Sequence, residues 1–244
     1  MKLIIVENYE EASVEAAKVM LEQVKSNPNS HLGLATGSTP IRLYELMIED
    51  HKNNGTSYKN IKSFNLDEYY GLKATHPQSY HYFMDKHLFS GIDIDQSNVH
   101  VPNGFGDIQA NCDDYNTLLK ENGVDLQLLG IGSNGHIGFN EPGTSFDSVT
   151  HYIELKESTR QDNARLFFDG KIEDVPTHAI TMGIKNILDA KKVLLIACGE
   201  NKAEPIRVLV EGTMTTDTPA SALQEHNDVV VIVDKAAASL LTKK

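Results

Sequence analysis

The fold is decided by residues 31–48, which read HLGLATGSTPIRLYELMI. An apolar run at 31–35 predicts a strand. A turn with glycine, hydroxyl side chains and proline follows, and then apolar positions at helical spacing over residues 41–48. We expect Thr39 to supply a hydroxyl N-cap for this helix and Pro40 to stand in its first turn. Strand, glycine turn and helix in this order are typical of a parallel α/β sheet.

The same alternation of short apolar runs and amphipathic stretches continues in both directions. Strands are predicted at 3–6, 31–35, 62–66, 124–130, 152–155, 178–182, 193–197 and 229–233, and helices at 9–25, 41–48, 78–89, 107–121 and 200–210. Because this alternation implies parallel pairing through right-handed crossovers, we expect a three-layer α/β/α sandwich around a Rossmann-like, mostly parallel sheet. No linker, repeat or low-complexity tract interrupts the sequence, so residues 1–244 are expected to form a single domain.

Composition excludes several kinds of partner. The net charge is −12, with 40% apolar and 23% charged residues. Nucleic acids and membrane surfaces are polyanions that select basic faces, so neither is expected as a partner. The apolar runs are too short for a membrane span or a signal-peptide core, and we expect a cytoplasmic protein. Cys112 and Cys198 cannot build a disulfide framework, and their surroundings predict a surface thiol and a buried thiol, respectively.

Ligands of open α/β sheets bind at the carboxyl ends of the strands, which directs attention first to residues 35–40. Glycine lets the backbone approach a ligand, hydroxyls add donors, and the following helix N-terminus presents unpaired N–H groups. This combination favours a phosphate. The Gly-Lys-Ser/Thr of a nucleotide loop is missing, so a sugar phosphate suits it better than a triphosphate. The alternative is a capped helix after a tight turn.

The second candidate segment is FNLDEYYG, residues 64–71, where two adjacent carboxylates follow an apolar strand. Asp67, partly shielded from water at the strand end, would have the raised pKa that a general base uses. The equally simple alternative is that these acids cap the following turn.

The third segment is GIGSNGHIGFNEPG, residues 130–143. Its opening matches the G-x-G-x-x-G of dinucleotide sites, but Gly138 and Pro142 prevent the helix that such sites require. What remains is a glycine-rich loop that presents Asn134, His136 and Glu141. Histidine titrates near neutrality, and a nearby carboxylate can fix its tautomer and raise its basicity. We interpret the loop as catalytic rather than as a rigid turn around a structural histidine.

Other patterns are weaker. The sequence has no H-E-x-x-H, no paired cysteines, no calcium loop and no G-x-S-x-G, so neither a metal nor a serine nucleophile is expected. Arg160 and Arg165 stand in a predicted helix, and Lys202 follows a predicted strand. In an acidic protein, such cations near strand ends are candidates for meeting an anionic ligand, although surface solvation is the default for any one of them.

Taken in order, these motifs closely resemble those of the glucosamine-6-phosphate deaminase family. The matching segments are 35–40, 64–69, 76–80, 130–142, 158–160 and 199–203, which span nearly the whole chain. The related 6-phosphogluconolactonases share the Gly-Ser-Thr-Pro loop and a glycine–histidine loop. Their acidic motif usually ends in Glu-Arg, and their histidine loop continues towards Ser-Leu-Phe-Pro. The stretches 67–69 and 139–142 have the deaminase form here.

The resemblance implies an enzyme of amino-sugar catabolism that converts glucosamine 6-phosphate and water into fructose 6-phosphate and ammonia, without metal or organic cofactor. His136, held by Asn134 and Glu141, would move a proton between the anomeric hydroxyl and the ring oxygen. Asp67 would take the proton from C2 and return it at C1 through an enol-type intermediate. The phosphate would be held by Gly37, Ser38, Thr39, Arg165 and Lys202.

Two departures from the family pattern bear on how the histidine is stabilised and on allosteric regulation. Some members carry Asp at the position of Asn134, and an amide cannot stabilise an imidazolium with a full charge. Longer relatives have an allosteric site for N-acetylglucosamine 6-phosphate, whereas residues 149–151 lack the expected arginines. We expect a monomer or small homo-oligomer without this activation.

The alternative functions are a 6-phosphogluconolactonase-like hydrolase and a non-catalytic sugar-phosphate-binding module. The deaminase and these two alternatives differ in the product formed.

Overall fold

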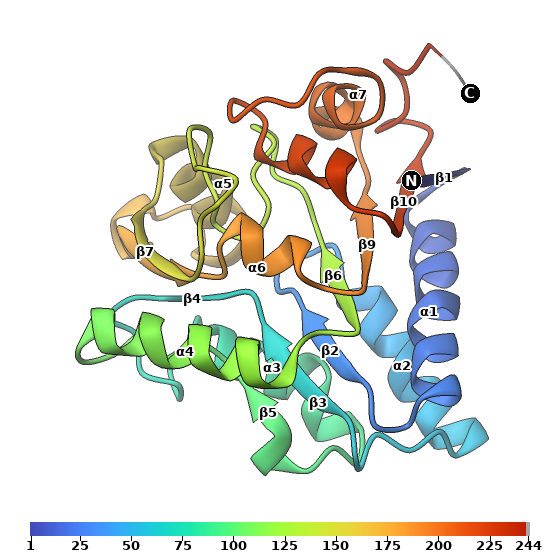
Figure 1. The fold of residues 1–244 in the computed structure, drawn as a ribbon, viewed down its shortest axis with the longest axis vertical. Coiled ribbons are helices and arrows are strands. Elements are labelled where there is room, and N and C mark those ends of the chain that lie inside the picture. Colours follow the sequence, from blue (N-terminus) through green and yellow to red (C-terminus); the bar gives the residue numbers. More distant parts are fainter. Residues whose placement is uncertain (243–244) are drawn as a thin grey trace.

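The computed structural model describes residues 1–242 as two sheets with flanking helices (Figure 1). The strands are β1 (Lys2–Val6), β2 (His31–Leu34), β3 (Lys62–Asn65), β4 (Asp67–Tyr69), β5 (Val99–His100), β6 (Leu126–Leu129), β7 (His151–Glu154), β8 (His178–Thr181), β9 (Lys192–Ala197) and β10 (Val229–Asp234). The α-helices are α1 (Tyr9–Ser26), α2 (Ile41–Asn54), α3 (Tyr80–His87), α4 (Ile108–Asn122), α5 (Glu157–Phe167), α6 (Ile184–Leu188) and α7 (Ala203–Glu211). Short 3₁₀ helices lie at Phe89–Gly91, Gln96–Asn98, Ile172–Asp174, Glu200–Lys202 and Pro219–Glu225.

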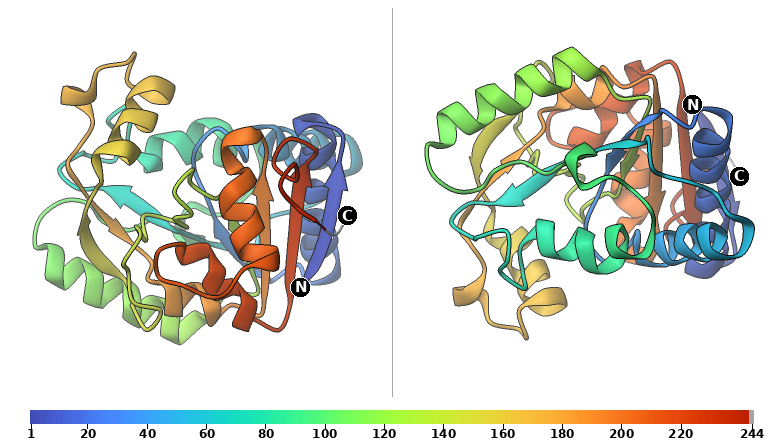
Figure 2. Two further views of the ribbon diagram at one scale, coloured as in Figure 1. Left: turned by 90° about the horizontal axis from the view of Figure 1, so that it is seen from above. Right: turned by 90° about the horizontal axis from the view of Figure 1, so that it is seen from below.

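The large sheet has seven parallel strands in the order β1-β10-β9-β6-β2-β3-β5. Helices α2 and α3 lie on one face, and α4 and α6 lie on the opposite face (Figure 2). This arrangement confirms the predicted three-layer α/β/α sandwich with a mostly parallel sheet. Within this sheet, β2 is followed by β3 on one side, whereas β6 is followed by β9 on the other, after the chain has passed through β7 and β8. The loops after β2 and β6 therefore diverge, and such a switch point is where open α/β sheets bind ligands.

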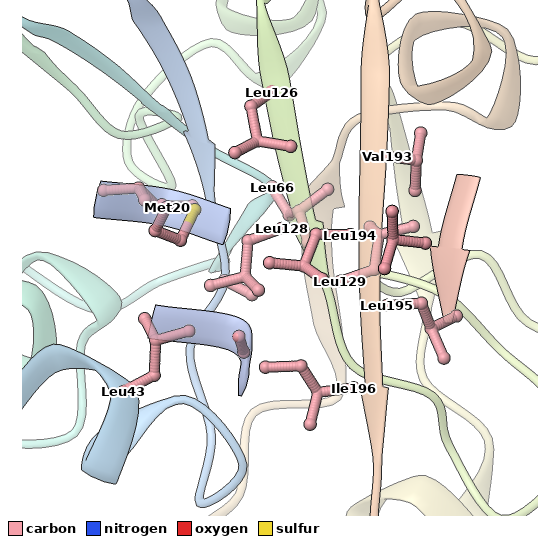
Figure 3. Packing of buried hydrophobic residues seen from close by; sticks show 14 of the residues in the cluster. Met20, Leu43, Leu66, Leu126, Leu128, Leu129, Val193, Leu194, Leu195 and Ile196 are labelled. Carbon is pink, nitrogen blue, oxygen red and sulfur yellow. The ribbon is translucent and has the colours of Figure 1, made fainter. Parts of the chain in front are cut away.

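The main core lies on both faces of the central strands. Along β9, Val193 and Leu195 point to one side, while Ile196 points towards α1 and α2, which contribute Met20 and Leu43 (Figure 3). All five side chains are buried. Burial on both faces explains why the strands read as continuous apolar runs rather than as alternating patterns.

A second, antiparallel sheet of three strands, β4-β8-β7, stands beside the large one. The strands predicted at 152–155 and 178–182 belong to this sheet, because apolar periodicity marks a strand without naming its partner. The chain passes from one sheet to the other at Leu66, whose N–H donates to Leu34 O (3.1 Å) and whose carbonyl accepts from Met182 N (2.7 Å). Asp67 is thereby fixed at the junction of the two sheets.

The start of α2 differs from the prediction made for Thr39. Pro40 occupies the N-cap position, and no side chain of the cap residue bonds to the helix. Instead, the hydroxyl of Tyr9, from α1, accepts from Arg42 N (3.2 Å). The same hydroxyl lies 3.1 Å from the carbonyl oxygens of Ser38 and Thr39. A tyrosine distant in sequence thus takes over the capping role, and it also holds the turn that precedes the helix.

Both cysteines are free thiols, with their predicted positions reversed. Cys112 is buried on the inner face of α4, and Cys198 is partly exposed. The polar residues around Cys112 occupy the other faces of an amphipathic helix, so the local composition wrongly predicted an exposed thiol. Within residues 1–242, no helix is both long enough and apolar enough to cross a membrane.

Candidate active site

A cavity of about 360 Å³ lies where the loops after β2 and β6 diverge. Of the candidate residues from the sequence, the cavity is lined by Gly37, Ser38, Thr39, Asp67, His136, Arg165 and Lys202. Asn134 and Glu141 lie behind His136 and contact it or each other. The fold therefore brings the predicted residues together from five separate parts of the chain.

One end of the cavity has the features of an anion site. Tyr9 holds the Ser38 carbonyl, and in a planar trans peptide the following N–H, that of Thr39, points the opposite way. Arg165 is two-thirds exposed and pairs with Asp162 at 3.3 Å. Burial lowers the pKa of Lys202 despite the opposing effect of Asp162. A cation that has lost hydration gains from an anionic partner, so this end is suited to a phosphate group.

His136 is oriented by a chain of hydrogen bonds that ends at α5. Its Nδ1 lies 2.7 Å from Asn134 Oδ1, and Asn134 Nδ2 donates to Glu141 Oε2 (2.9 Å). The other oxygen of Glu141 accepts from the Thr159 hydroxyl (2.5 Å) and from Lys156 N (3.4 Å). On its other side the imidazole ring packs against Gly132, where an added Cβ would approach it to 2.2 Å. The ring is consequently held in one orientation.

The same bonds decide which nitrogen of His136 carries the proton. Asn134 Oδ1 also accepts from the backbone N–H of His136 (3.2 Å), while the amide nitrogen is engaged by Glu141. Because a carbonyl oxygen only accepts, Nδ1 of His136 must be the protonated nitrogen, and Nε2 keeps its lone pair. Burial lowers the pKa of His136 below 6.5, against the opposing charge of Glu141. His136 is therefore a neutral proton acceptor at pH 7.

Asp67 forms part of the cavity wall at the start of β4. Its side chain is nearly buried, and the loop after β6 passes beside it: a Cβ added to Gly138 would lie 3.6 Å from Asp67 Oδ2. Burial, together with the charge of Glu68, raises the pKa of Asp67 well above 3.8. A carboxylate that gains basicity from its surroundings can act as a general base.

The adjacent acid, Glu68, has a different role. Its carboxylate accepts from the backbone N–H groups of Tyr80 (2.9 Å) and His81 (3.1 Å), the first two residues of α3, and lies 2.8 Å from His81 Nδ1. The capping alternative weighed for this acidic pair thus applies to Glu68. Neighbouring side chains point to opposite sides of a strand, which separates the two carboxylates.

Sequence reasoning assigned no site role to two residues that contact this machinery, Thr159 and Asp162. Thr159 anchors Glu141, and its place in the 158–160 motif was the available signal. Asp162 lines the cavity three residues before Arg165. Arg160, considered as an anion partner, instead donates to the carbonyls of Ile172 (2.8 Å) and Val175 (3.1 Å). Among residues 1–242, no cluster of three or more His, Cys, Asp or Glu residues could hold a metal ion.

An anion site, a neutral histidine and a basic carboxylate at the switch point of a parallel sheet define an α/β enzyme that acts on a small anionic substrate. Residues 7–232 match the family described as glucosamine-6-phosphate isomerases/6-phosphogluconolactonase. The chain belongs to this family.

Several relatives at about 50% identity are named as deaminases. A protein of Geobacillus sp. (strain WCH70) named glucosamine-6-phosphate deaminase is 54% identical over 99% of this chain and 96% of its own length. One from Clostridium botulinum (strain Kyoto / Type A2), with the same name, is 51% identical over the full length of both. The solved structure of a monomeric glucosamine-6-phosphate deaminase is 48% identical with a TM-score of 0.95, covering 98% of this chain and all of that one. The 6-phosphogluconolactonase of Trypanosoma brucei shares the fold, at 18% identity and a TM-score of 0.81 over 98% of each chain.

Proposed function

We propose that this chain, acting as one domain over residues 1–244, converts glucosamine 6-phosphate and water into fructose 6-phosphate and ammonia. The observation that carries the proposal is that the 37–39 loop, the Asp67 carboxylate and the His136 imidazole line one cavity. The full-length relatives at about 50% identity bear the name of this activity.

His136 opens the pyranose ring. Its Nε2 accepts the proton of the anomeric hydroxyl and returns it to the ring oxygen as the C1–O5 bond breaks. The bond from Nδ1 to Asn134 keeps Nε2 as the acceptor, and Glu141 sets the orientation of Asn134. Because Asn134 is neutral, the imidazolium formed in this step is stabilised mainly by Glu141, whose Oε2 lies 3.8 Å from Nδ1.

Asp67 carries out the isomerisation of the open-chain aldehyde. Its carboxylate removes the proton from C2 while the substrate's C2 ammonium gives a proton to O1, and the resulting enolamine takes a proton at C1 from the same carboxyl group. This leaves an iminium at C2, to which water adds before ammonia departs. Carbonyl acidity and proton transfer account for every step, so we propose no metal or organic cofactor.

The phosphate is bound by residues 37–39, Arg165 and Lys202. This binding, remote from the reacting carbons, orients C1 and C2 beside Asp67. Held by Tyr9, the loop presents its N–H groups and hydroxyls in a preformed arrangement, which reduces the ordering cost of binding.

Replacing Tyr9 with Phe is expected to raise KM for glucosamine 6-phosphate about fivefold with kcat within twofold of wild type, since one net hydrogen bond that positions the phosphate loop is lost. Steady-state ammonia release measures both constants. Tyr82→Phe, at an exposed tyrosine on α3, is the matched control. An unchanged KM in Tyr9→Phe would mean that the loop needs no support from α1.

We also propose a monomer or small homo-oligomer in the cytoplasm, with a small-molecule substrate and without nucleic-acid or membrane partners. The solved deaminase at 48% identity is described as monomeric, and both cysteines here are free, as is usual in a reducing compartment. The substrate curve is expected to be hyperbolic and insensitive to N-acetylglucosamine 6-phosphate. A sigmoidal curve abolished by that effector would contradict this prediction.

The activity is tested by offering the purified protein glucosamine 6-phosphate and 6-phosphogluconolactone separately. We expect ammonia and fructose 6-phosphate in equal amounts from the first and no hydrolysis above background of the second. Lactone hydrolysis without ammonia release would assign the chain to the lactonase branch. Binding of both sugar phosphates without turnover of either would make it a binding module.

A further inference from the structure

One carboxylate lies among the cations at the phosphate end of the cavity. Asp162 stands on α5, three residues before Arg165, and lines the cavity with Arg165 and Lys202. Its Oδ1 accepts from Arg165 Nη2 at 3.3 Å, and its Oδ2 accepts from the Ser133 hydroxyl at 3.2 Å. The proposed mechanism uses neither Asp162 nor this ion pair.

The charges of Asp162, Arg165 and Lys202 act on one another and on any ligand that enters the cavity. Asp162 raises the pKa of Lys202, whereas burial and Arg165 lower it. An incoming phosphate therefore meets an arginine that already has a carboxylate partner, and a negative charge that remains beside the site after Arg165 turns to the phosphate. Both effects oppose binding of a dianion.

We propose that Asp162 sets the affinity of this enzyme for phosphorylated sugars by competing with the phosphate for Arg165 and by repelling the phosphate directly. The inference rests on the proposed function. Asp162 pairs with Arg165 and acts on the charge of Lys202, and both cations are among the residues proposed to bind the phosphate. Phosphate binding is common to substrate and product, and such uniform binding lowers KM without raising kcat. A competing carboxylate therefore lowers kcat/KM without lowering kcat, and it speeds product release.

The test is direct binding of fructose 6-phosphate and of inorganic phosphate by calorimetry, at low and high ionic strength. The variant Asp162→Asn keeps an oxygen to accept from Ser133 while removing the charge. We expect both ligands to bind about three- to tenfold more tightly to Asp162→Asn than to wild type at low salt, with the difference shrinking at high salt. KM is expected to fall by a similar factor without an increase in kcat. Asp189→Asn, at an exposed Asp that pairs with Lys185, is the matched control.

A second pair of variants tests the route through Arg165. In an Arg165→Met background, the gain from Asp162→Asn should be smaller, because the competition has no arginine left to act on. Equal or weaker phosphate binding by Asp162→Asn would overturn the inference and make Asp162 a residue that holds Arg165 in its productive position. If wild type itself does not bind fructose 6-phosphate, the proposed function fails and the inference fails with it.

Discussion

Asp67→Asn is expected to lower kcat for ammonia release about a thousandfold while leaving KM within a few-fold of wild type. The amide has the size and shape of the carboxyl group but cannot take a proton from C2 or return one at C1. The phosphate loop and Lys202 belong to other elements, so ground-state binding persists. The measurement is fructose 6-phosphate formation over long incubations at enzyme concentrations high enough to detect the residual rate.

The same variant is expected to be at least as stable as wild type at neutral pH. Burial and Glu68 raise the folded-state pKa of Asp67 above its ordinary 3.8. A carboxyl group with a raised folded pKa binds more protons in the folded than in the unfolded state, so its contribution to stability falls as pH rises above 3.8. Removing it removes that cost. Thermal melts at pH 7 should show an unchanged or higher Tm.

Two results would contradict the role of Asp67. Substantial activity in Asp67→Asn would move the proton transfers to another group. Loss of activity together with a collapsed Tm would mean that the residue supports the junction of the two sheets rather than the reaction. Asp189→Asn, in which an exposed carboxylate is changed in the same way, should keep both activity and Tm.

His136→Gln has the second largest expected effect, a loss of about a hundredfold in kcat/KM. Glutamine can occupy the space and form hydrogen bonds, but it cannot accept the anomeric proton. The loss is smaller than for Asp67→Asn because sugar rings also open without a catalyst. Ring opening should then limit the rate, so an isotope effect from deuterium at C2 should be smaller in the variant than in wild type. His87→Gln, on α3, is the control.

The pH dependence follows from the two shifted groups. Both must be unprotonated, and burial moves the pKa of His136 below 6.5 while that of Asp67 rises above 3.8. The contribution of His136 to the acidic limb of kcat/KM should therefore lie below pH 6.5, and that of Asp67 above pH 3.8. A limb at or above 6.5 that vanishes in His136→Gln would show that the histidine titrates normally.

The large sheet was predictable because its main strands are covered on both faces. Strands buried in this way have an unbroken run of apolar residues. The small sheet was not, since Asp67–Tyr69 is only three residues long and carries two acids. The strands predicted at 152–155 and 178–182 are present, but β7 alternates between half-buried and exposed residues instead of forming an unbroken apolar run. Their antiparallel pairing depends on where the chain leaves β3 to form β4. The local sequence of these strands does not carry that information.

For the site, the ordered motifs predicted one set of residues. The fold places members of that set, from Gly37 to Lys202, around one cavity. What local reasoning missed are contacts between distant segments. Thr39 was assigned the cap of α2, but Tyr9, thirty residues earlier, supplies the acceptor. Asp162 resembles any charged residue on a helix surface until Arg165 and Lys202 are placed beside it. Such partners depend on tertiary packing rather than on spacing in the sequence.

The most direct test follows one hydrogen. Glucosamine 6-phosphate deuterated at C2 is converted by the wild-type protein in H₂O, and the C1 methylene of fructose 6-phosphate is examined by NMR. If the single fixed carboxyl group of Asp67 returns the hydrogen at C1, the product carries one deuterium there, entirely in one of the two diastereotopic positions. Deuterium spread over both positions, or none at C1, would contradict proton transfer by Asp67 in this cavity.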